Sequence, residues 1–423
     1  MRKLIKDSDF VPVQMNNLVL DGKVTAGSYN APTSDAVAKS VALGEESMMA
    51  NLPIAANTLR FSFGDLDYDP TEHWEGRDGT WTKKNTKFTN VWDWTNENTN
   101  WATAFGGGST TNPGAFADYE NNPVKVIAAG DTSTVTDFSR FFQNCYAITE
   151  ICPIDTSNAT NVFLMFSYCD NCTKFPDMDF SSATETRAVY QHCINMVSGP
   201  NIIFPTDHDF NLTNFFWGCE KLETVPLYNL ERCTNTTAMF QAANSNSDMS
   251  LKMVPEFNTS NVTSMGKMFV NCDIKTVPKF HTSNVTDMNN MFEYCEYLQA
   301  IPVLDTSKVS DMHNMFYECK SLSEIPALDY SKVTRFDGFA NKCENLTKIP
   351  EMNIEANVTR CDGMFADCSG IKSGQKALYD KLSAIGTITN HTGCFKNCGI
   401  DTPEGRAQLE QIPKSWGGLK AEE

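Results

Sequence analysis

The sequence predicts an α/β repeat solenoid of about eleven coils, with smaller parts before and after it. Three observations support this fold class. A phrase of about 24 residues recurs between Asp131 and Cys398, each copy carries a cysteine or its substitute in one slot, and most copies carry an apolar residue followed by proline in another. A period of roughly 20 to 50 residues indicates stacked units that cannot bury their apolar faces alone. We therefore predict a solenoid over residues 129 to 400.

Each coil is predicted to contain a strand, a turn and a short helical segment. The segment from 322 to 326 is short and carries the apolar residues Leu322 and Ile325, so we expect it to add one strand to a parallel sheet, which Pro326 terminates. The Asp-Thr-Ser group that begins at Asp305 is typical of a turn, because such side chains bond their own backbone. Apolar residues three apart, as at Met265 and Met268, predict a helical or 3₁₀ turn against that strand.

The cysteine slot predicts a ladder of buried thiols. Neighbouring coils of such a stack lie about 4.8 Å apart, but side chains in equivalent slots run parallel and do not converge as a disulfide requires. We therefore expect the thiols to act as small apolar side chains. Ala243 fills the slot in one copy. The predicted ladder is Cys145, Cys169, Cys193, Cys219, Cys272, Cys295, Cys319, Cys343, Cys368 and Cys398.

The other cysteines are Cys152, Cys172, Cys233, Cys361 and Cys394, and local pairing among them is left open. The pair Cys169-x-x-Cys172 resembles half of a zinc motif. No second half follows at ligand spacing, so we predict no zinc site.

The repeated phrase resembles a known family. The pattern Asp-Thr-Ser-Asn-Val-Thr-x-Met-x-x-Met-Phe-x-x-Cys-x-x-Leu-x-x-Ile-Pro is similar to the BspA-like leucine-rich repeat of bacterial surface proteins from mycoplasmas and Bacteroidetes. The similarity covers roughly the last two thirds of the chain, and the copies at residues 183 to 210 and 230 to 253 depart most. The resemblance implies an interaction scaffold and not an active site, although a fold alone does not name a ligand.

Residues 1 to 45 are predicted to anchor the chain. Their positively charged start lacks the apolar core of a Sec signal peptide. Residues 27 to 41 resemble segments near the N-termini of phage fibre and head-decoration proteins, and they predict an extended stretch followed by a short capped helix. We expect this helix to attach to a capsid or tail subunit, and packing on the same chain is the alternative. The predicted attachment residues are Tyr29, Pro32, Asp35, Val37 and Val41.

Residues 46 to 128 are predicted to form a small aromatic-rich domain that contains strands. Alternating patterns predict strands at residues 59 to 63 and 90 to 94. Two interpretations of its tryptophans are open. They form a cap that seals the first coil, or a platform for carbohydrate, since indole faces stack on sugar rings. The predicted ligand-binding residues are Trp74, Trp81, Trp92, Trp94 and Trp101.

The Asp-x-Asp-x-Asp run that begins at Asp65 resembles the start of a calcium loop. Pro70 stands where such a loop needs glycine, and Gly76 stands where it needs glutamate. We therefore predict an acidic surface turn.

Composition and motifs exclude several functions. The formal net charge of -18 opposes nucleic-acid binding, which needs a basic surface to displace counterions. No apolar stretch approaches the roughly 20 residues of a membrane helix. We find no zinc-protease motif, phosphate-binding loop or nucleophile elbow, so we predict no catalytic residue, cofactor or metal. A glycan-cleaving depolymerase stays open, because its two carboxylates can come from distant coils.

The C-terminal residues predict two helices. Residues 374 to 382 have an amphipathic pattern, and residues 402 to 413 begin with Pro403 and Glu404, which suit the first turn of a helix. We predict that residues 401 to 423 cap the solenoid.

These features predict a non-enzymatic bacteriophage fibre or decoration protein on the virion surface. The solenoid would present one face to a host-surface glycan or protein, and the chain would form a homo-oligomer. The alternatives are a BspA-like adhesin on a bacterial cell surface and a rigid structural spacer.

Overall fold

The computed structural model describes residues 135–144, 148–151, 153–243 and 249–422, and the backbone of four short strands before them. The chain forms two compact units, residues 1–205 and 206–423. The predicted strand at residues 90 to 94, the predicted helix after Pro32 and the acidic run at Asp65 lie outside the described residues. The predicted domain boundaries stay predictions.

The first unit contains a parallel sheet of order β1-β4-β5, formed by β1 (Thr58–Arg60), β4 (Val124–Ala128) and β5 (Ile148–Ile151). Strand β1 overlaps the strand predicted at residues 59 to 63, and β5 occupies the apolar segment predicted to form a strand in each coil. A short antiparallel pair joins β2 (Trp74–Glu75) to β3 (Thr82–Lys83). Further along the chain, β6 (Met178–Asp179) pairs in parallel with β7 (Ile202–Ile203).

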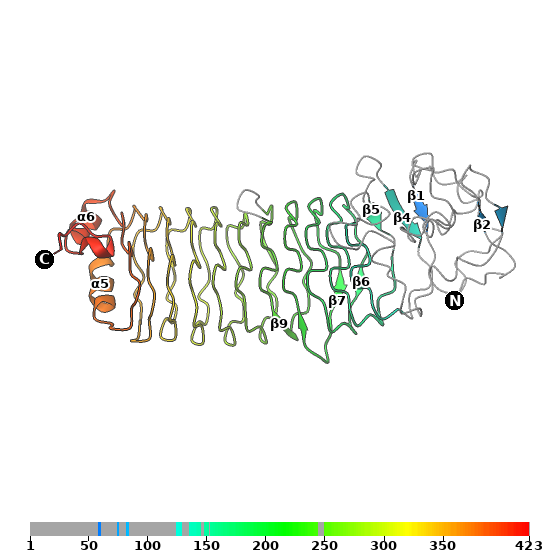
Figure 1. Ribbon diagram of the computed structural model, residues 1–423, viewed down its shortest axis with the longest axis horizontal. Coiled ribbons are helices and arrows are strands. Elements are labelled where there is room, and N and C mark those ends of the chain that lie inside the picture. The colour runs from blue at the N-terminus through cyan, green and yellow to red at the C-terminus, as the bar shows by residue number, and fades with distance from the viewer. Residues whose placement is uncertain are drawn as a thin grey trace. The chain divides into compact units, whose positions relative to one another are not determined.

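The second unit is a stack of coils joined by parallel pairing. It begins with β8 (Phe210–Asn211) and β9 (Cys233–Asn235). A series of parallel bridges then joins each coil to the next at one repeat position, through Asn235, Ser264, Asp287, Asp311, Arg335, Arg360 and Asn390. Further bridges join Met249 to Cys272 and Lys348 to Ser373. These bridges recur at about the period of the sequence repeat, and the coils that they join lie side by side in Figure 1.

The predicted position of the strand is wrong for most of this unit. Residues 322 to 326 form no strand, and the pairing lies instead at the position of Asp311. Proline has no backbone N–H to donate to a neighbouring coil, so the Ile-Pro segment supports little pairing.

The predicted helical turn is also wrong, because residues 313 to 318 form consecutive turns. The Met315 amide donates to the Met312 carbonyl at 3.2 Å, whereas the next amide, of Phe316, donates to Phe339 in the following coil at 2.8 Å. Successive backbone amides therefore alternate, with one donating within its own coil and the next donating to the following coil. Asn314 has a φ of 51°, which no right-handed helix contains. The described coils before residue 375 contain no helix.

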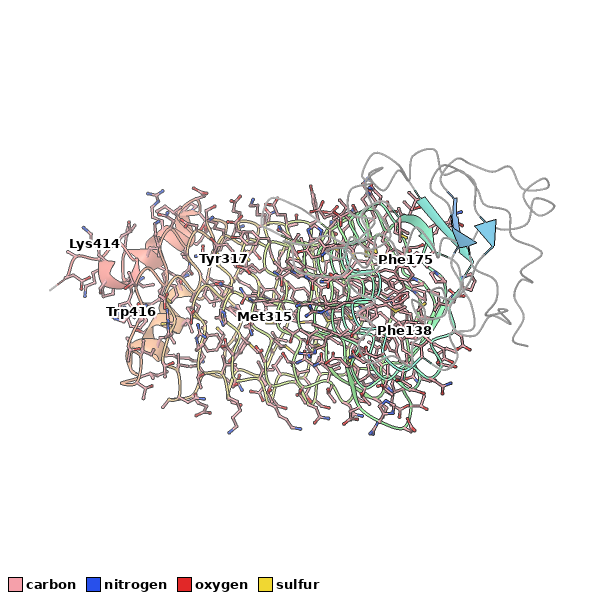
Figure 2. The ribbon with its side chains drawn as sticks, turned by 45° about the vertical axis from the view of Figure 1, so that its right-hand side comes forward. Phe138, Phe175, Met315, Tyr317, Lys414 and Trp416 are labelled. Carbon is pink, nitrogen blue, oxygen red and sulfur yellow. The ribbon has the colours of Figure 1, made fainter. Side chains whose placement is uncertain are left out.

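The core of the second unit is a column of aromatic rings. The rings of Phe269, Phe292 and Phe316 stack with centroids 5.7 Å apart and interplanar angles of 2° and 8°. The column turns at Phe339, which stands one position earlier in its coil, and its ring meets Phe316 at 84°. Met315 is also fully buried inside its coil (Figure 2).

The cysteine slot lies beside this column. The Cys319 thiol donates to the carbonyl of Phe292 in the preceding coil at 3.0 Å, and Cys295 makes the same contact with Phe269 at 2.9 Å. The thiols are therefore hydrogen-bond donors as well as small apolar side chains. Burial raises the pKa of Cys295 to about 12. The described cysteines of the slot are all buried thiols, namely Cys169, Cys193, Cys219, Cys272, Cys295, Cys319, Cys343, Cys368 and Cys398.

The other described cysteines, Cys172, Cys233, Cys361 and Cys394, are also buried and free. Cys145 and Cys152 lie outside the described residues.

Two helices and a 3₁₀ turn end the second unit, as α5 (Gln375–Ser383), α6 (Pro403–Leu409) and η3 (Lys414–Trp416) (Figure 1). Both predicted C-terminal helices are confirmed. Thr402 caps α6, and its hydroxyl accepts the Gly405 amide at 3.0 Å. Within the described residues, no helix has both the length and the apolar character needed to cross a membrane.

Candidate functional site

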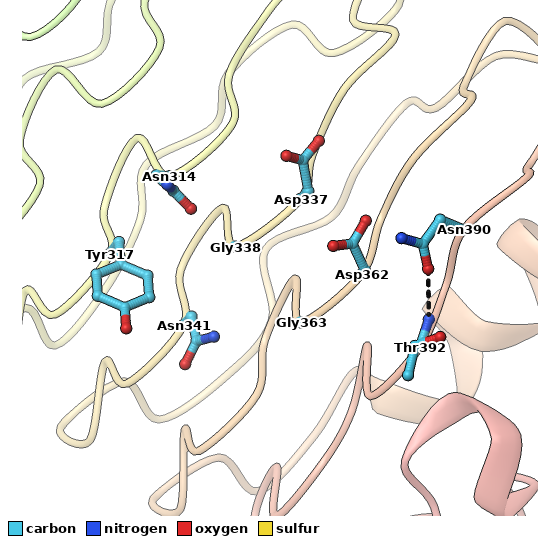
Figure 3. A pocket seen from close by; sticks show the side chains of 9 residues that line it. All are labelled: Asn314, Tyr317, Asp337, Gly338, Asn341, Asp362, Gly363, Asn390 and Thr392. Carbon is cyan, nitrogen blue, oxygen red and sulfur yellow. Dashed lines mark hydrogen bonds between the residues drawn. The ribbon is translucent and has the colours of Figure 1, made fainter.

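A hollow of about 520 Å³ opens across four successive coils of the second unit (Figure 3). This volume lies in the usual range of small-ligand sites. The lining is polar, with the aromatic ring of Tyr317 on one side. The other lining residues are the amides Asn314, Asn341 and Asn390, the hydroxyl of Thr392, the carboxylates Asp337 and Asp362, and the glycines Gly338 and Gly363.

Two glycines create the floor of the hollow. Gly338 and Gly363 have φ values of 61° and 60° and occupy the slot that Asn290 and Asn314 fill in the preceding coils. Left-handed backbone suits glycine, and asparagine tolerates it better than most residues. A Cβ on Gly338 would overlap Asn314 Oδ1, whereas a Cβ on Gly363 would lie 3.1 Å from the nearest side-chain atom. The absence of side chains in two successive coils leaves the surface hollowed.

The two carboxylates are held by arginines of the neighbouring row. Arg335 bonds Asp337 at 3.0 Å and Asp311 at 3.2 Å, while Arg360 contacts Asp362 at 3.2 Å and Asp337 at 3.7 Å. The hydrogen bond to Asp337 raises the pKa of Arg335 above its ordinary value. Alternating charges along the coils therefore fix the carboxylates in place, and the hollow carries little net charge.

The ring of Tyr317 is held by its neighbours. The Lys342 ammonium lies 5.4 Å from the ring centroid, and it also bonds Glu318 at 2.5 Å, which raises the pKa of Lys342. The ring of Tyr294 meets Tyr317 edge to face at 5.3 Å. The orientation of the ring is thus set before any ligand arrives.

Backbone groups of the floor are already paired. The backbone N–H of Asn314 donates to the backbone carbonyl of Asp337 at 2.9 Å. In the same way, the backbone N–H of Gly338 donates to Asp362 at 2.8 Å, and that of Gly363 donates to Thr392 at 3.0 Å. Side chains must therefore supply the contacts to any ligand.

One of these side chains has unused bonding capacity. Asn341 Oδ1 is shielded from solvent and has no hydrogen-bond partner among the described residues. Nearby, the Asn390 side chain accepts the Thr392 amide at 3.3 Å (Figure 3).

The arrangement is one of donors and acceptors without a reactive group. Within the part of the chain that the structure describes, no three histidine, cysteine, aspartate or glutamate side chains are placed to hold a metal ion. Both carboxylates of the hollow are already bonded to arginines. Such a site is suited to binding ligands that both donate and accept hydrogen bonds.

The described residues that line this hollow include no tryptophan. Trp74 begins β2, where it pairs with Lys83 of β3. The other four, Trp81, Trp92, Trp94 and Trp101, lie outside the described residues, as do the predicted attachment residues Tyr29, Pro32, Asp35, Val37 and Val41. Their roles stay predictions.

Sequence analysis missed the hollow, although a signal for it was present. In the slot five residues before the cysteine position, the last three copies carry glycine, namely Gly338, Gly363 and Gly393, whereas the two copies before them carry Asn290 and Asn314. A change from asparagine to glycine at one repeat position indicates a lost side chain on an otherwise regular surface.

Comparison with known proteins identifies the family. The family described as "Mycoplasma protein of unknown function, DUF285" matches residues 86–198, 110–249, 184–276, 210–297 and 271–377. A solved leucine-rich cell surface protein from Faecalibacterium prausnitzii A2-165 is 16% identical, with 80% of this chain and 96% of that chain covered, and its TM-score of 0.29 is too low to support an argument. None of the curated proteins matches the sequence.

The family matches overlap and follow one another along the chain, as expected of a repeat. They agree with the resemblance to BspA-like repeats. Because together they extend from residue 86 to residue 377 of the 423 residues, the chain belongs to the DUF285 family.

Proposed function

We propose that this protein is a non-enzymatic adhesin on a bacterial surface, whose coils present a binding face to a glycan or protein of another surface. The observation that carries the proposal is the polar hollow, which lies on a backbone fixed by hydrogen bonds between coils. Membership of the DUF285 family, together with the resemblance to BspA-like surface repeats, supports a display role. Sites held on rigid elements bind with a smaller ordering cost than sites on free loops.

The bacteriophage fibre gains no support from the family matches. That prediction depended on residues 27 to 41, which lie outside the described residues. The adhesin, first weighed as the alternative, is therefore the better proposal, and attachment to a virion stays a prediction.

The hollow favours binding over catalysis. A glycosidase needs one carboxyl group free to donate a proton and a second to act as base or nucleophile. Asp337 and Asp362 instead bond Arg335 and Arg360. We therefore propose binding without cleavage, and we do not favour the depolymerase.

The net charge of the chain restricts the classes of molecule that it can bind. A net charge of -18 opposes polyanions such as nucleic acid. Homo-oligomer formation stays a prediction.

Display can be tested on the cells that produce the chain. An antibody raised against the full chain should label intact cells, and external protease should remove the label. Purified chain should then compete with those cells for attachment to their target surface. Labelling seen only after the cells are opened would refute the adhesin.

A further inference from the structure

We propose that the hollow binds an uncharged polysaccharide whose chain runs across the coils. This inference rests on the proposed adhesin function, because it names the class of partner for the same site. It is argued from the side chains of the lining, the paired backbone, the balance of charge and the spacing of the coils.

The lining matches sugar hydroxyls. Each hydroxyl group both donates and accepts, and the hollow offers amides that do both beside carboxylates that accept. Asn341 Oδ1 is shielded from water and lacks a partner among the described residues. A buried acceptor without a partner is costly. Because the atom is shielded, the Asn341 side chain must turn before a ligand hydroxyl can donate a hydrogen bond to it.

The backbone argues against an extended peptide. Peptides that add to a surface as a strand need free N–H and C=O groups at its edge. The backbone N–H groups of Asn314, Gly338 and Gly363 already donate to backbone carbonyls of the next coil. Recognition must therefore go through side chains, which suits a sugar better than a peptide backbone.

The charges argue for an uncharged ligand. Asp337 and Asp362 each bond an arginine, so the hollow has no unmatched positive group for an acidic sugar. The chain as a whole carries a charge of -18, which repels polyanions. Long-range electrostatic repulsion and the absence of an unmatched positive group in the hollow therefore both disfavour an acidic polysaccharide.

The coil spacing sets the direction of the ligand. In the coils of the hollow, the ring centroids of Phe316, Phe339 and Phe365 follow one another at 5.4 Å and 5.9 Å. An extended chain of pyranose rings repeats on the same scale. Successive sugars can then meet the coils of Asn314, Gly338 and Gly363 in turn. Tyr317, with its ring already oriented by Lys342, can pack against the apolar face of one sugar.

The variant Gly363→Asn puts a side chain into the hollow. Its Cβ would lie 3.1 Å from Asn341 Nδ2, so the Asn341 side chain must shift by a few tenths of an ångström. Asn314 occupies the same slot with a φ of 51°, so asparagine fits the backbone at this position. The matched control is Lys267→Asn, which makes the same residue in the same slot outside the hollow, at a φ of 60°. Thermal midpoints of both variants equal to that of the unsubstituted chain would show that neither change disturbs the fold.

The test is native electrophoresis of the full chain through gels that contain xylan, mannan or a soluble β-glucan, with polygalacturonate as the acidic comparison. We expect at least one neutral polysaccharide to retard the chain and polygalacturonate to leave it unretarded. Gly363→Asn should weaken that retardation at least tenfold, and Lys267→Asn should leave it unchanged.

Several results would overturn the inference. These are no retardation by any neutral polysaccharide, equal retardation of the two variants, or equal retardation by polygalacturonate. The outcome is separable from that of the adhesin. If the Gly363→Asn variant still competes for cell attachment, the adhesin proposal stands and the proposed sugar site is refuted. If a neutral polysaccharide retards the chain but antibody does not label intact cells, the sugar site stands and display on the cell surface is refuted.

Discussion

Replacing Cys319 with alanine tests what the buried thiols contribute. The side chain is fully buried, and its thiol donates to the Phe292 carbonyl at 3.0 Å. That carbonyl also accepts the Cys295 amide at 3.0 Å, so the substitution removes one of its two hydrogen bonds. The variant therefore loses packing and one weak bond while the fold keeps its backbone contacts.

The expected cost follows from these contacts. Removing a buried group about the size of a methyl forfeits about 0.8 kcal/mol of transfer free energy. A residual cavity of about 20 Å³ adds about 0.5 kcal/mol, and the lost bond adds about 0.5 kcal/mol. We expect Cys319→Ala to lower the free energy of unfolding by about 2 kcal/mol.

Urea unfolding followed by circular dichroism measures this cost. The control is Ser323→Ala, an exposed position of the same coil, which should change the free energy of unfolding by less than about 0.5 kcal/mol. A loss below about 0.5 kcal/mol for Cys319→Ala would refute the claim that the thiol is both packed and bonded.

Three further predictions concern pH, a buried hydroxyl and a helix cap. Burial raises the pKa of Cys233 and Cys295 from 9.0 to about 12, so the unfolded chain releases these protons first as the pH rises. The free energy of unfolding should therefore fall above about pH 9 by about 1.4 kcal/mol per pH unit for each thiol, and equal stability in urea at pH 8 and pH 10 would contradict this. Tyr330 is fully buried and its hydroxyl has no partner among the described residues, so Tyr330→Phe should raise the free energy of unfolding by about 1 kcal/mol, and a loss would show a hidden partner. Thr402→Ala removes the cap of α6 and should cost about 1 kcal/mol, with an unchanged melting temperature as the contrary result.

The repeat was predictable because one residue per coil occupies the same environment. The period follows directly from the recurring cysteine and proline positions, and the C-terminal helices follow from local signals such as Pro403 after Thr402. These features depend on residues close together in sequence or on exact recurrence.

The path of the backbone was harder to predict. Apolar residues three apart suit one face of a helix, but they equally suit consecutive turns that each point a side chain inward. The distinguishing signal is the left-handed slot, which holds Asn290 and Asn314 but also Lys267 and Ala238, all with positive φ. Lys267 and Ala238 are residue types that rarely adopt left-handed backbone, so the slot cannot be recognised from its residue types alone. Contacts with neighbouring coils overcome the preference of these residues for right-handed backbone.

The hollow was missed for a different reason. It depends on side chains missing from Gly338 and Gly363 and on carboxylates held by arginines of their own coil. The same arginines also contact carboxylates of the preceding coil. Such lateral contacts join residues about 24 positions apart, so the pattern within a single coil does not contain them.

The central claim is that the coils present the hollow as a binding site for a neutral sugar chain. The most direct measurement is a crystal structure of the full chain grown with an oligosaccharide from the neutral polysaccharide that retards it most. We expect sugar density against Tyr317 and between Asp337 and Asp362, with a hydroxyl bonded to Asn341. Sugar bound elsewhere on the chain, with this hollow left empty at saturating concentration, would contradict the account.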